Sequence, residues 1–456
     1  MTDVAQLQRE HFPGRTYQDI ARADGEALPP VLMQRSNPAQ STEDIPFARY
    51  TSRDFFDREM RLMWRRVWQY ACREEHVPEI GDYYVYDIGR WSLVIVRTDD
   101  GLRAYHNSCL HRGTKLKPSG SNGWTGTIQC PFHGWQWSLD GSLQHIPCAW
   151  EFPHLDRVKA CLPQARIESW NGFIFVNFDG EAPPLVDYLE VLPDHFARWD
   201  MTNWYVHTHV QKRLPGNWKL AQEAFMEAYH TPVAHPEMTH MVSDHNMQHD
   251  IFSDHVSRDL CAMASPSPTS TLQRTEQELL DSMLVDRSIT GGRALVPEGR
   301  SARWVMADQL RRQMAEGYGL DYSDRTVPEM IDSLKYNVFP NLFIYPSIGL
   351  PLIQQFRPDG ENPDYSLFDQ MVLRPKPTDG SDYEVAEVVR IDENQSYADV
   401  EGMDPFLAHV LDQDTDIMRW QREGMYASEK GAETLSLYQE SRIRHLHRTL
   451  DKYLAA

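Results

Sequence analysis

Cysteine and histidine occur together twice, 21 positions apart, in the stretch from Cys109 to Trp135. One residue separates the members of the first pair and two separate those of the second, so the candidate ligands are Cys109, His111, Cys130 and His133. Two thiolates and two imidazoles on two short loops form a closed set of four ligands. Zinc accepts such a mixed set in tetrahedral geometry. A two-iron, two-sulfide cluster accepts it with the cysteines on one iron and the histidines on the other.

The way in which the two loops share these ligands favours the two-iron cluster. Zinc fingers usually hold their cysteines as one close pair and their histidines as another, whereas here each loop supplies one of each. Glycines around the ligands permit tight turns, and Pro131, Trp135 and Trp137 can shield the site from solvent. The arrangement, including the C-P-x-H-G-W order of the second loop, resembles the Rieske motif. We therefore expect a Rieske [2Fe–2S] cluster, which moves one electron at a time and needs an acceptor.

A second candidate metal site lies at 217–236, where two histidines are five positions apart. We expect an amphipathic helix here, broken by Pro232, that directs His230 and His235 toward one point. Glu227 precedes His230 by one helical turn and is expected on the same face. Two histidines and one carboxylate form the facial triad of non-heme Fe(II) oxygenases, which leaves open positions for O₂.

The carboxylate of such a triad has to come from elsewhere, and LDQDTDIMRWQREG offers Asp412, Asp414 and Asp416. Asp414 is preferred because it shares a predicted helix face with Ile417, Met418 and Gln421, so that it is expected to point inward. The alternative for all three is a solvated acidic segment at a helix start, which the helix dipole favours.

The elements that must position these ligands indicate an α+β fold. A helix is predicted at 52–68 from the spacing of its apolar residues, and short alternating segments separated by Gly and Asp turns follow it. We place a small all-β domain at 46–180. The polar, proline-containing segment 1–45 is expected to be an arm with little structure of its own, together with part of the larger domain.

The larger domain is placed at 181–456 and mixes strands with helices. It contains a long polar and helical excursion at 262–335 and a tail at 404–453 that we expect to be helical throughout. Phe225, Met226 and Val233, which lie next to the candidate ligands, are expected to line a substrate pocket. An apolar lining favours an aromatic or other hydrophobic substrate.

Composition excludes several classes of function. The net charge of −21, from 45 Lys and Arg against 66 Asp and Glu, argues against a nucleic-acid partner. No run of 18 apolar residues and no apolar signal-peptide core occur, so we expect a cytoplasmic protein without a membrane segment. Six cysteines are too few for a disulfide framework. No G-x-G-x-x-G turn and no second cysteine set are present, so no flavin or NAD site is expected in this chain.

Together these stretches resemble the catalytic (α) subunit of Rieske non-heme iron ring-hydroxylating oxygenases, over most of the chain. The resemblance implies a small all-β Rieske domain inserted in a larger, helix-grip-like catalytic domain with an antiparallel sheet and C-terminal helices. It implies that His230, His235 and Asp414 hold a mononuclear iron. It also implies a head-to-tail homotrimer, in which Glu227 links His133 of a neighbouring chain to His230.

The resemblance further implies a terminal oxygenase that uses O₂ and electrons from a separate NAD(P)H-dependent reductase, with or without a ferredoxin. Monohydroxylation, dihydroxylation and oxidative demethylation of a small, aromatic substrate share this apparatus. Glu227, where many ring dioxygenases have Asp, resembles the branch built of α subunits alone, which includes enzymes acting on quaternary amines, so a betaine is an alternative substrate. The alternatives from other classes are a Rieske electron-transfer protein without oxygenase chemistry and a zinc-stabilised module.

Overall fold

The computed structural model describes residues 15–36, 41–156, 159–286 and 294–455. The chain divides into two compact units. The inserted unit comprises Asp57–Tyr188 and Pro358–Asn362, and the larger unit comprises the remaining residues. The first stretch of the inserted unit interrupts the sequence of the larger one, which confirms the predicted α+β fold with an inserted domain. The predicted boundaries at residues 46 and 180 stay predictions.

The inserted unit is built on a seven-stranded sheet with the strand order β2-β11-β10-β5-β4-β3-β6. Its hairpins follow from local sequence. Asn171 and Gly172 both have positive φ (51° and 80°) and join Trp170 of β10 to Phe173 of β11, as a tight two-residue hairpin requires. The strands are β2 (Gln69–Arg73), β3 (Asp82–Ile88), β4 (Trp91–Thr98), β5 (Gly101–His106), β6 (Asn122–Trp124), β10 (Gln164–Trp170) and β11 (Phe173–Asn177).

A separate three-stranded sheet extends the inserted unit, in the order β7-β8-β9. The predicted helix at 52–68 is shorter than expected, because its helical turns end at Met63. Helices α5 (Arg53–Arg58) and α6 (Leu185–Leu189) cross the boundaries of the inserted unit. The remaining elements within it are η1 (Glu59–Met63), η2 (Glu74–His76), β7 (Ile128–Gln129), β8 (Gln136–Trp137), β9 (Leu143–His145) and η3 (Ala149–Glu151).

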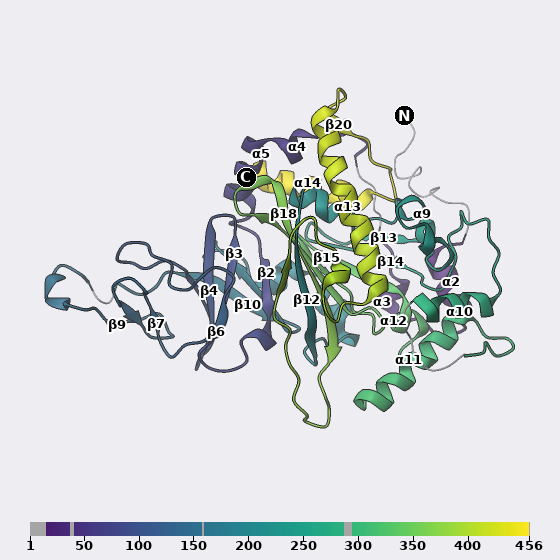
Figure 1. Ribbon diagram of the computed structural model, residues 1–456, viewed down its shortest axis with the longest axis horizontal. Coiled ribbons are helices and arrows are strands. Elements are labelled where there is room, and N and C mark those ends of the chain that lie inside the picture. The colour runs from purple at the N-terminus through teal and green to yellow at the C-terminus, as the bar shows by residue number, and fades with distance from the viewer. Residues whose placement is uncertain (1–14, 37–40, 157–158, 287–293, 456) are drawn as a thin grey trace. The chain divides into compact units, whose positions relative to one another are not determined.

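The larger unit contains an eight-stranded sheet in the order β13-β14-β15-β16-β17-β18-β12-β19 (Figure 1). Its described pairings are antiparallel except that of β12 with the short strand β19, which is parallel. The strands are β12 (Trp204–Leu214), β13 (Gln248–Ile251), β14 (Val256–Cys261), β15 (Ser333–Val338), β16 (Leu342–Ile344), β17 (Leu352–Asp359), β18 (Asn362–Pro375) and β19 (Val389–Ile391).

The long helix α13 (Pro405–Ala427) packs against β12 of this sheet (Figure 1). Its buried residues recur at helical spacing and include Ala408, Leu411 and Met418. Lys212 of β12 donates a hydrogen bond to Thr415 of α13 at 3.0 Å. These contacts fix the rotation of the helix about its axis, and therefore the direction of every side chain it presents to the sheet.

The tail was predicted to be helical throughout, and this is wrong. Residues 428–440 separate α13 from α14 (Ser441–Ala455), and within this break β20 (Ala432–Glu433) pairs with β1 (Ile45–Pro46). Gly431, at φ +69°, supplies a left-handed turn that a helix cannot contain.

The prediction that segment 1–45 has little structure is also wrong for residues 15–36, whereas 1–14 and 37–40 lie outside the described residues. Thr16 caps α2 (Tyr17–Ala23) in a reciprocal capping box with Asp19, and Tyr17 is buried with its hydroxyl bonded to Asp332.

The helices and helical turns not yet named are α3 (Pro30–Met33), α4 (Ala48–Thr51), α7 (Leu192–His195), η4 (Phe196–Arg198), α8 (Trp218–Glu223), α9 (Thr231–Ala234), η5 (Pro236–His240), η6 (Asp244–Asn246), α10 (Glu276–Asp286), α11 (Ala302–Tyr318), α12 (Val327–Ile331) and η7 (Tyr397–Asp399).

None of the helices within the described ranges combines the length and the apolar character that a membrane-spanning segment requires.

Candidate metal centres

The two cysteine–histidine loops of the inserted unit close with the same backbone pattern. The amide of Cys109 donates to the carbonyl of Thr114 at 2.9 Å, and the amide of Gly113 donates back to Cys109 at 2.9 Å. The second loop repeats this, with Cys130 donating to Trp135 at 2.8 Å and Gly134 to Cys130 at 3.1 Å. Both glycines have positive φ (77° and 74°), which explains why each loop carries glycine four positions after its cysteine.

These loops bring the four predicted ligands together as two pairs. The thiols of Cys109 and Cys130 are buried and lie within hydrogen-bonding reach of each other. The imidazoles of His111 and His133 are half-buried, and their Nδ1 atoms lie 3.2 Å apart. Burial is the main reason that the pKa of the Cys109 thiol is raised, and only hydrogen bonds from backbone amides oppose it. A pair of thiols beside a pair of imidazoles suits a cluster of two metal ions with different ligands.

Aromatic rings surround the imidazole pair. The ring of Trp135 stacks on His111, with 5.1 Å between centroids and 5° between planes, and Phe132 lies 3.8 Å from His133. Trp135 and Trp137 are buried, as expected of residues that shield the site. Pro131 is exposed, so its predicted shielding role is wrong. The hairpin turn holds its ring on the solvent side of the loop.

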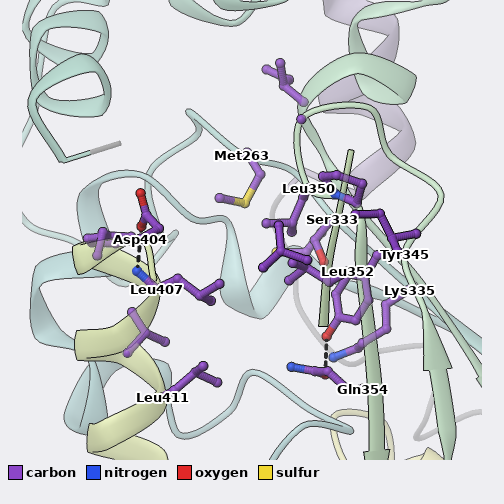
Figure 2. A pocket seen from close by; sticks show the side chains of 18 of the residues that line it. Met263, Ser333, Lys335, Tyr345, Leu350, Leu352, Gln354, Asp404, Leu407 and Leu411 are labelled. Atoms are coloured by element: carbon purple, nitrogen blue, oxygen red, sulfur yellow. Dashed lines mark hydrogen bonds between the residues drawn. The ribbon is translucent and has the colours of Figure 1, made fainter. Parts of the chain in front are cut away.

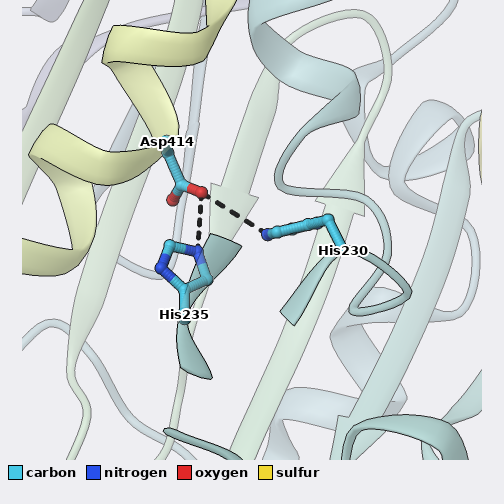
Figure 3. A group of neighbouring side chains, drawn as sticks. All are labelled: His230, His235 and Asp414. Carbon is cyan, nitrogen blue, oxygen red and sulfur yellow. Dashed lines mark hydrogen bonds and ion pairs between the residues drawn. The ribbon is translucent and has the colours of Figure 1, made fainter. Parts of the chain in front are cut away.

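In the larger unit, His230, His235 and Asp414 converge on one point (Figure 3). His235 Nε2 lies 2.8 Å from Asp414 Oδ1, and His230 Nε2 lies 3.4 Å from the same oxygen. His230 and His235 flank α9, a single turn that begins with Thr231 and Pro232, and Asp414 projects from α13. One turn between the two histidines therefore sets their common direction, and the packing of α13 brings the carboxylate to them.

The other ring nitrogen of each histidine is held by a side-chain oxygen. Nδ1 of His230 lies 2.6 Å from Glu227 Oε1, and Nδ1 of His235 lies 2.7 Å from Gln413 Oε1. An amide or carboxylate oxygen accepts a hydrogen bond there, so in the neutral form that binds a metal the proton of each ring lies on Nδ1. The Nε2 lone pairs are then free to bind a metal at the point where both rings face Asp414.

A continuous helix was predicted to bring Glu227 to His230, and this is wrong. Helix α8 ends at Glu223, and residues 224–230 form turns. The Glu227 carboxylate instead accepts the backbone amide of His230 at 3.1 Å and that of Tyr229 in a short contact. These bonds fold the segment back so that the same carboxylate meets the His230 ring.

The charges of this group fit a bound cation. Burial is the largest single influence and lowers the pKa of both histidines, but hydrogen bonds to side-chain oxygens and the negative charge of Asp414 together outweigh burial. With Glu227 in addition, the pKa of His230 rises to about 10, and that of His235 is also raised. Burial opposes ionisation of Asp414, yet hydrogen bonds from the two histidines hold its pKa below the usual range. The point between the three side chains therefore favours positive charge, and two imidazoles with one carboxylate are ligands that Fe(II) accepts.

The neighbouring carboxylates on α13 serve other purposes. Asp412 accepts a hydrogen bond from the amide of Tyr397 at 3.1 Å and pairs with Lys212 at 3.3 Å, and Asp416 is exposed. Asp414 is buried, but the predicted reason is only half right. Ile417 and Gln421, which were expected to share its inward face, are exposed, whereas Met418 is buried.

A cavity of about 630 Å³ adjoins the three converging side chains. Phe225 lines it, as expected, and Met226 is buried without being one of its lining residues. Val233 is 88% exposed, so its predicted place in the pocket is wrong. It occupies the outer side of α9, because that single turn directs its two flanking histidines inward.

Sequence reasoning missed much of the cavity wall. Strand β15 presents Ser333 and Lys335 to the cavity, and Tyr345 and Gln354 join them (Figure 2). The alternation of a strand would have placed positions 333 and 335 on one face. Gln413, which is hydrogen-bonded to the ligand His235, was missed as well, because the spacing of residues in a helix does not reveal which of them bonds to a metal ligand.

Comparison with known protein families identifies two regions of the chain. Residues 67–160 match the Rieske [2Fe-2S] domain, and residues 201–456 match the ring hydroxylating alpha subunit (catalytic domain). These matches confirm the predicted [2Fe–2S] cluster and mononuclear iron as the cofactors of such domains.

Curated relatives include oxygenase subunits with different substrates. The carnitine monooxygenase oxygenase subunit of Escherichia coli (strain K12) is 32% identical over 204 residues, which cover 44% of this chain and 54% of that protein. The large oxygenase component of the naphthalene 1,2-dioxygenase system of Pseudomonas putida is 32% identical over 195 residues, covering 40% and 42%. The chain thus spans about half the length of the curated relatives that it matches.

Solved structures share the fold over nearly the whole chain. A quaternary ammonium Rieske monooxygenase in complex with L-carnitine superposes with a TM-score of 0.64 at 17% identity, covering 94% of this chain and 99% of that one. A naphthalene 1,2-dioxygenase with indole bound superposes with a TM-score of 0.61 at 16% identity, covering 93% of each chain.

Proposed function

Because this chain belongs to the family of ring-hydroxylating α subunits, we propose that it is the terminal component of a Rieske-type non-heme iron oxygenase. It uses O₂ and two electrons to hydroxylate or oxidatively demethylate a small organic molecule with an apolar, aromatic body. The observation that carries this proposal is the convergence of His230, His235 and Asp414 beside a cavity large enough for such a molecule.

The ligand assignment follows from the two groups of side chains. Cys109 and Cys130 would hold one iron of the cluster and His111 and His133 the other. His230, His235 and Asp414 would hold the mononuclear iron. When bound, the cluster supplies single electrons and the mononuclear iron supplies the site of O₂ activation.

The side chains around these ligands have roles that the structure supports directly. Glu227 and Gln413 keep the Nδ1 proton on His230 and His235, so that both Nε2 atoms stay available and aimed at one point. Phe225 and the apolar wall exclude water from the cavity and hold a substrate body against that point. Trp135 covers His111 and limits solvent access to the imidazole pair.

Electrons are proposed to pass between subunits of a homotrimer, from His133 of one chain through Glu227 of the next to His230. Two exposed apolar groups support this proposal. Leu110 and Phe132, 40% and 57% exposed, flank the imidazoles of the inserted unit. In the larger unit, Tyr229 lies two positions after Glu227 and Val233 lies on α9, the turn between His230 and His235; their side chains are 56% and 88% exposed. Exposed apolar groups of this kind mark interaction surfaces, and these two lie where each metal centre approaches the outside.

The electrons come from a separate NAD(P)H-dependent reductase, with or without a ferredoxin. A quaternary amine is the second candidate substrate, since relatives named for carnitine and for glycine betaine are 32% and 30% identical to this chain over the matched residues. Recognition of a quaternary ammonium group requires aromatic faces around the cation.

Iron quantitation combined with oxygen uptake tests the proposal. The oxygenase should contain about three iron atoms per chain, two in the cluster and one outside it. With a reductase, NADH and substrate it should consume O₂, and with NADH alone it should not. His230→Ala should remove about one third of the iron and leave the visible absorbance of the cluster. Two irons per chain in the unmodified protein would instead indicate an electron carrier, and a colourless zinc protein would indicate a structural module.

A further inference from the structure

A buried group of charges beside the cavity contains more cations than anions. Asp259 Oδ2 lies 3.2 Å from Lys335 Nζ and in short contact with Nη1 of Arg442. All three side chains are buried. The other described partners of the two cations are uncharged, namely the carbonyls of Phe225 and Met226 and the hydroxyl of Ser257. One carboxylate therefore faces two buried cations.

Two other buried arginines of the larger unit are paired with carboxylates, whereas the buried Arg444 is bonded, among the described residues, only to backbone carbonyls. Arg303 is bonded to two carboxylates, Asp24 and Asp332, and Arg258 to Asp250. Burying an unpaired charge is costly, so a buried cation is normally matched by an anion. The Lys335–Arg442 pair shares a single bonded carboxylate, and Lys335 borders the cavity.

Lys335 is the member of the group that reaches the cavity. An ammonium carries three N–H donors, and two of them are directed at Asp259 and the Phe225 carbonyl. Lys335 Nζ lies 5.8 Å from the centroid of the Tyr345 ring, and the Tyr345 hydroxyl donates a hydrogen bond to Gln354 Oε1 at 2.8 Å (Figure 2). The three ends form a polar group on the strand side of the cavity.

The opposite side of the cavity is mostly apolar, although His207, Gln313 and Arg374 also line the cavity. Leu407 and Leu411 of α13 face the strands, and Met263, Leu350 and Leu352 complete an apolar lining around the polar group (Figure 2). Asp404 also borders the cavity, but its carboxylate accepts the amide of Leu407 at 2.8 Å as the cap of α13. A ligand that matches these walls has an apolar body and one anionic end.

We propose that Lys335, with Tyr345 and Gln354, binds a carboxylate or similar anionic group of the substrate, so that the substrate is a hydrophobic ring compound with an acidic group. This rests on the proposed oxygenase function and narrows its substrate class. The anion supplies the charge that Asp259 alone does not, and its second oxygen accepts the Nε2 hydrogen of Gln354 that is not donated to Gln370, while the Tyr345 hydroxyl holds the Gln354 amide in place. A quaternary ammonium group would place a third cation beside Lys335 and Arg442, which Coulomb repulsion disfavours.

Burial is the main cause that lowers the pKa of Lys335, with Arg442 adding to it and Asp259 opposing it. An anionic ligand stabilises the ammonium form, so binding and protonation of Lys335 support each other.

The test uses matched ligands on the iron-loaded oxygenase with its reductase. Benzoate and 2-naphthoate are compared with their methyl esters and with glycine betaine, in calorimetric binding and in coupled O₂ uptake. We expect the acids to bind at least about tenfold more tightly than the esters, as one charge-assisted hydrogen bond implies. Tighter binding of the esters or of the betaine would overturn the proposal. If no compound stimulates O₂ uptake although three irons per chain are present, the oxygenase function itself fails, whereas ester or betaine turnover removes only the acid preference.

Lys335→Met provides the second arm, and its control is Lys376→Met, at a partly exposed lysine whose ammonium is bonded to the Thr202 carbonyl. Lys335→Met should raise the Kd and KM of the acids about tenfold or more and change those of the esters less than about twofold. Lys376→Met should change neither. An equal loss of affinity for acids and esters in Lys335→Met would overturn the proposal. If Lys335→Met does not fold, the comparison of acids, esters and betaine on the unmodified protein decides the proposal.

Discussion

The two candidate metal centres are assembled in opposite ways. The four ligands of the inserted unit come from 25 consecutive residues, Cys109–His133, on two loops that repeat one backbone pattern. The three ligands of the larger unit come from positions 230, 235 and 414, and the last of them reaches the site only because α13 packs on β12. The first centre is therefore fixed by local loop geometry and the second by tertiary packing.

This difference decides where each centre is vulnerable. In the loops, each ligand depends on a turn that its own neighbours close, so damage there should stay local. In the triad, Nε2 of both histidines and the carboxylate must meet at one point, and Glu227 and Gln413 each hold one ring in place. Loss of a triad residue should therefore empty one centre and leave the other intact, and this independence can be tested.

Asp414→Asn is expected to have the largest effect. It removes the charged ligand, so about one third of the iron and essentially all coupled O₂ uptake should be lost, while the visible spectrum of the cluster stays. Asp416→Asn, on the exposed side of the same helix, is the matched control and should retain both iron and activity. If Asp414→Asn keeps all three irons, the carboxylate of the triad has been misassigned.

Cys130→Ser should produce the converse pattern. Loss of one thiolate is expected to abolish the cluster, removing about two thirds of the iron and the visible absorbance, while iron bound by the triad stays. Activity should fall to background, because electrons no longer reach the cavity. Cys148→Ser, at an exposed cysteine of the inserted unit, serves as the control and should leave the iron content, the visible absorbance and the activity unchanged. Loss of all iron in Cys130→Ser would mean that the two centres do not assemble independently.

The same difference explains what the sequence could and could not predict. All four loop ligands could be identified from the sequence because cysteine, histidine and glycine recur at fixed short spacings. The structure brings these four ligands together. His230, His235 and Glu227 also meet, but through turns rather than the predicted helix, since helix α8 ends at Glu223. Nine residues of chain are short enough that either route brings them to one place.

Positions far apart in the chain were harder to predict. Helical spacing indicated that Asp414 points inward, although Ile417, which supported the argument, is exposed. Gln413 and Lys335 gain their meaning only from residues that lie 178 and 110 positions away in the chain, His235 and Phe225. No local pattern marks such partners, because the sheet and α13 create the proximity. Val233 was misplaced for the same reason, since the single turn α9 has an outer side that spacing alone does not reveal.

Gln413→Ala should have a smaller effect than loss of a ligand. The His235 ring loses the oxygen that fixes its Nδ1 proton and its orientation, and such outer partners typically change metal affinity 10- to 100-fold. We expect weaker iron retention during dialysis against a chelator, with the cluster unchanged. Gln413→Glu, which keeps an oxygen acceptor, should recover most of the affinity. An unchanged iron affinity in Gln413→Ala would show that the fold alone orients His235.

The smallest expected effect tests whether the two loops are equivalent. Gly113 and Gly134 have φ of +77° and +74°, and a Cβ at either position would meet no atom closer than 3.6 Å. Alanine should therefore fit sterically and cost only the left-handed backbone conformation, about 1–2 kcal/mol in each loop. Because the loops close with the same hydrogen bonds, Gly113→Ala and Gly134→Ala should lower the denaturant midpoint of cluster loss by similar amounts. Gly180→Ala, in open space without positive φ, is the control and should leave the midpoint unchanged. A large loss in only one loop would mean that the shared backbone pattern conceals unequal roles, with one loop set by its glycine and the other by the aromatic rings packed on it.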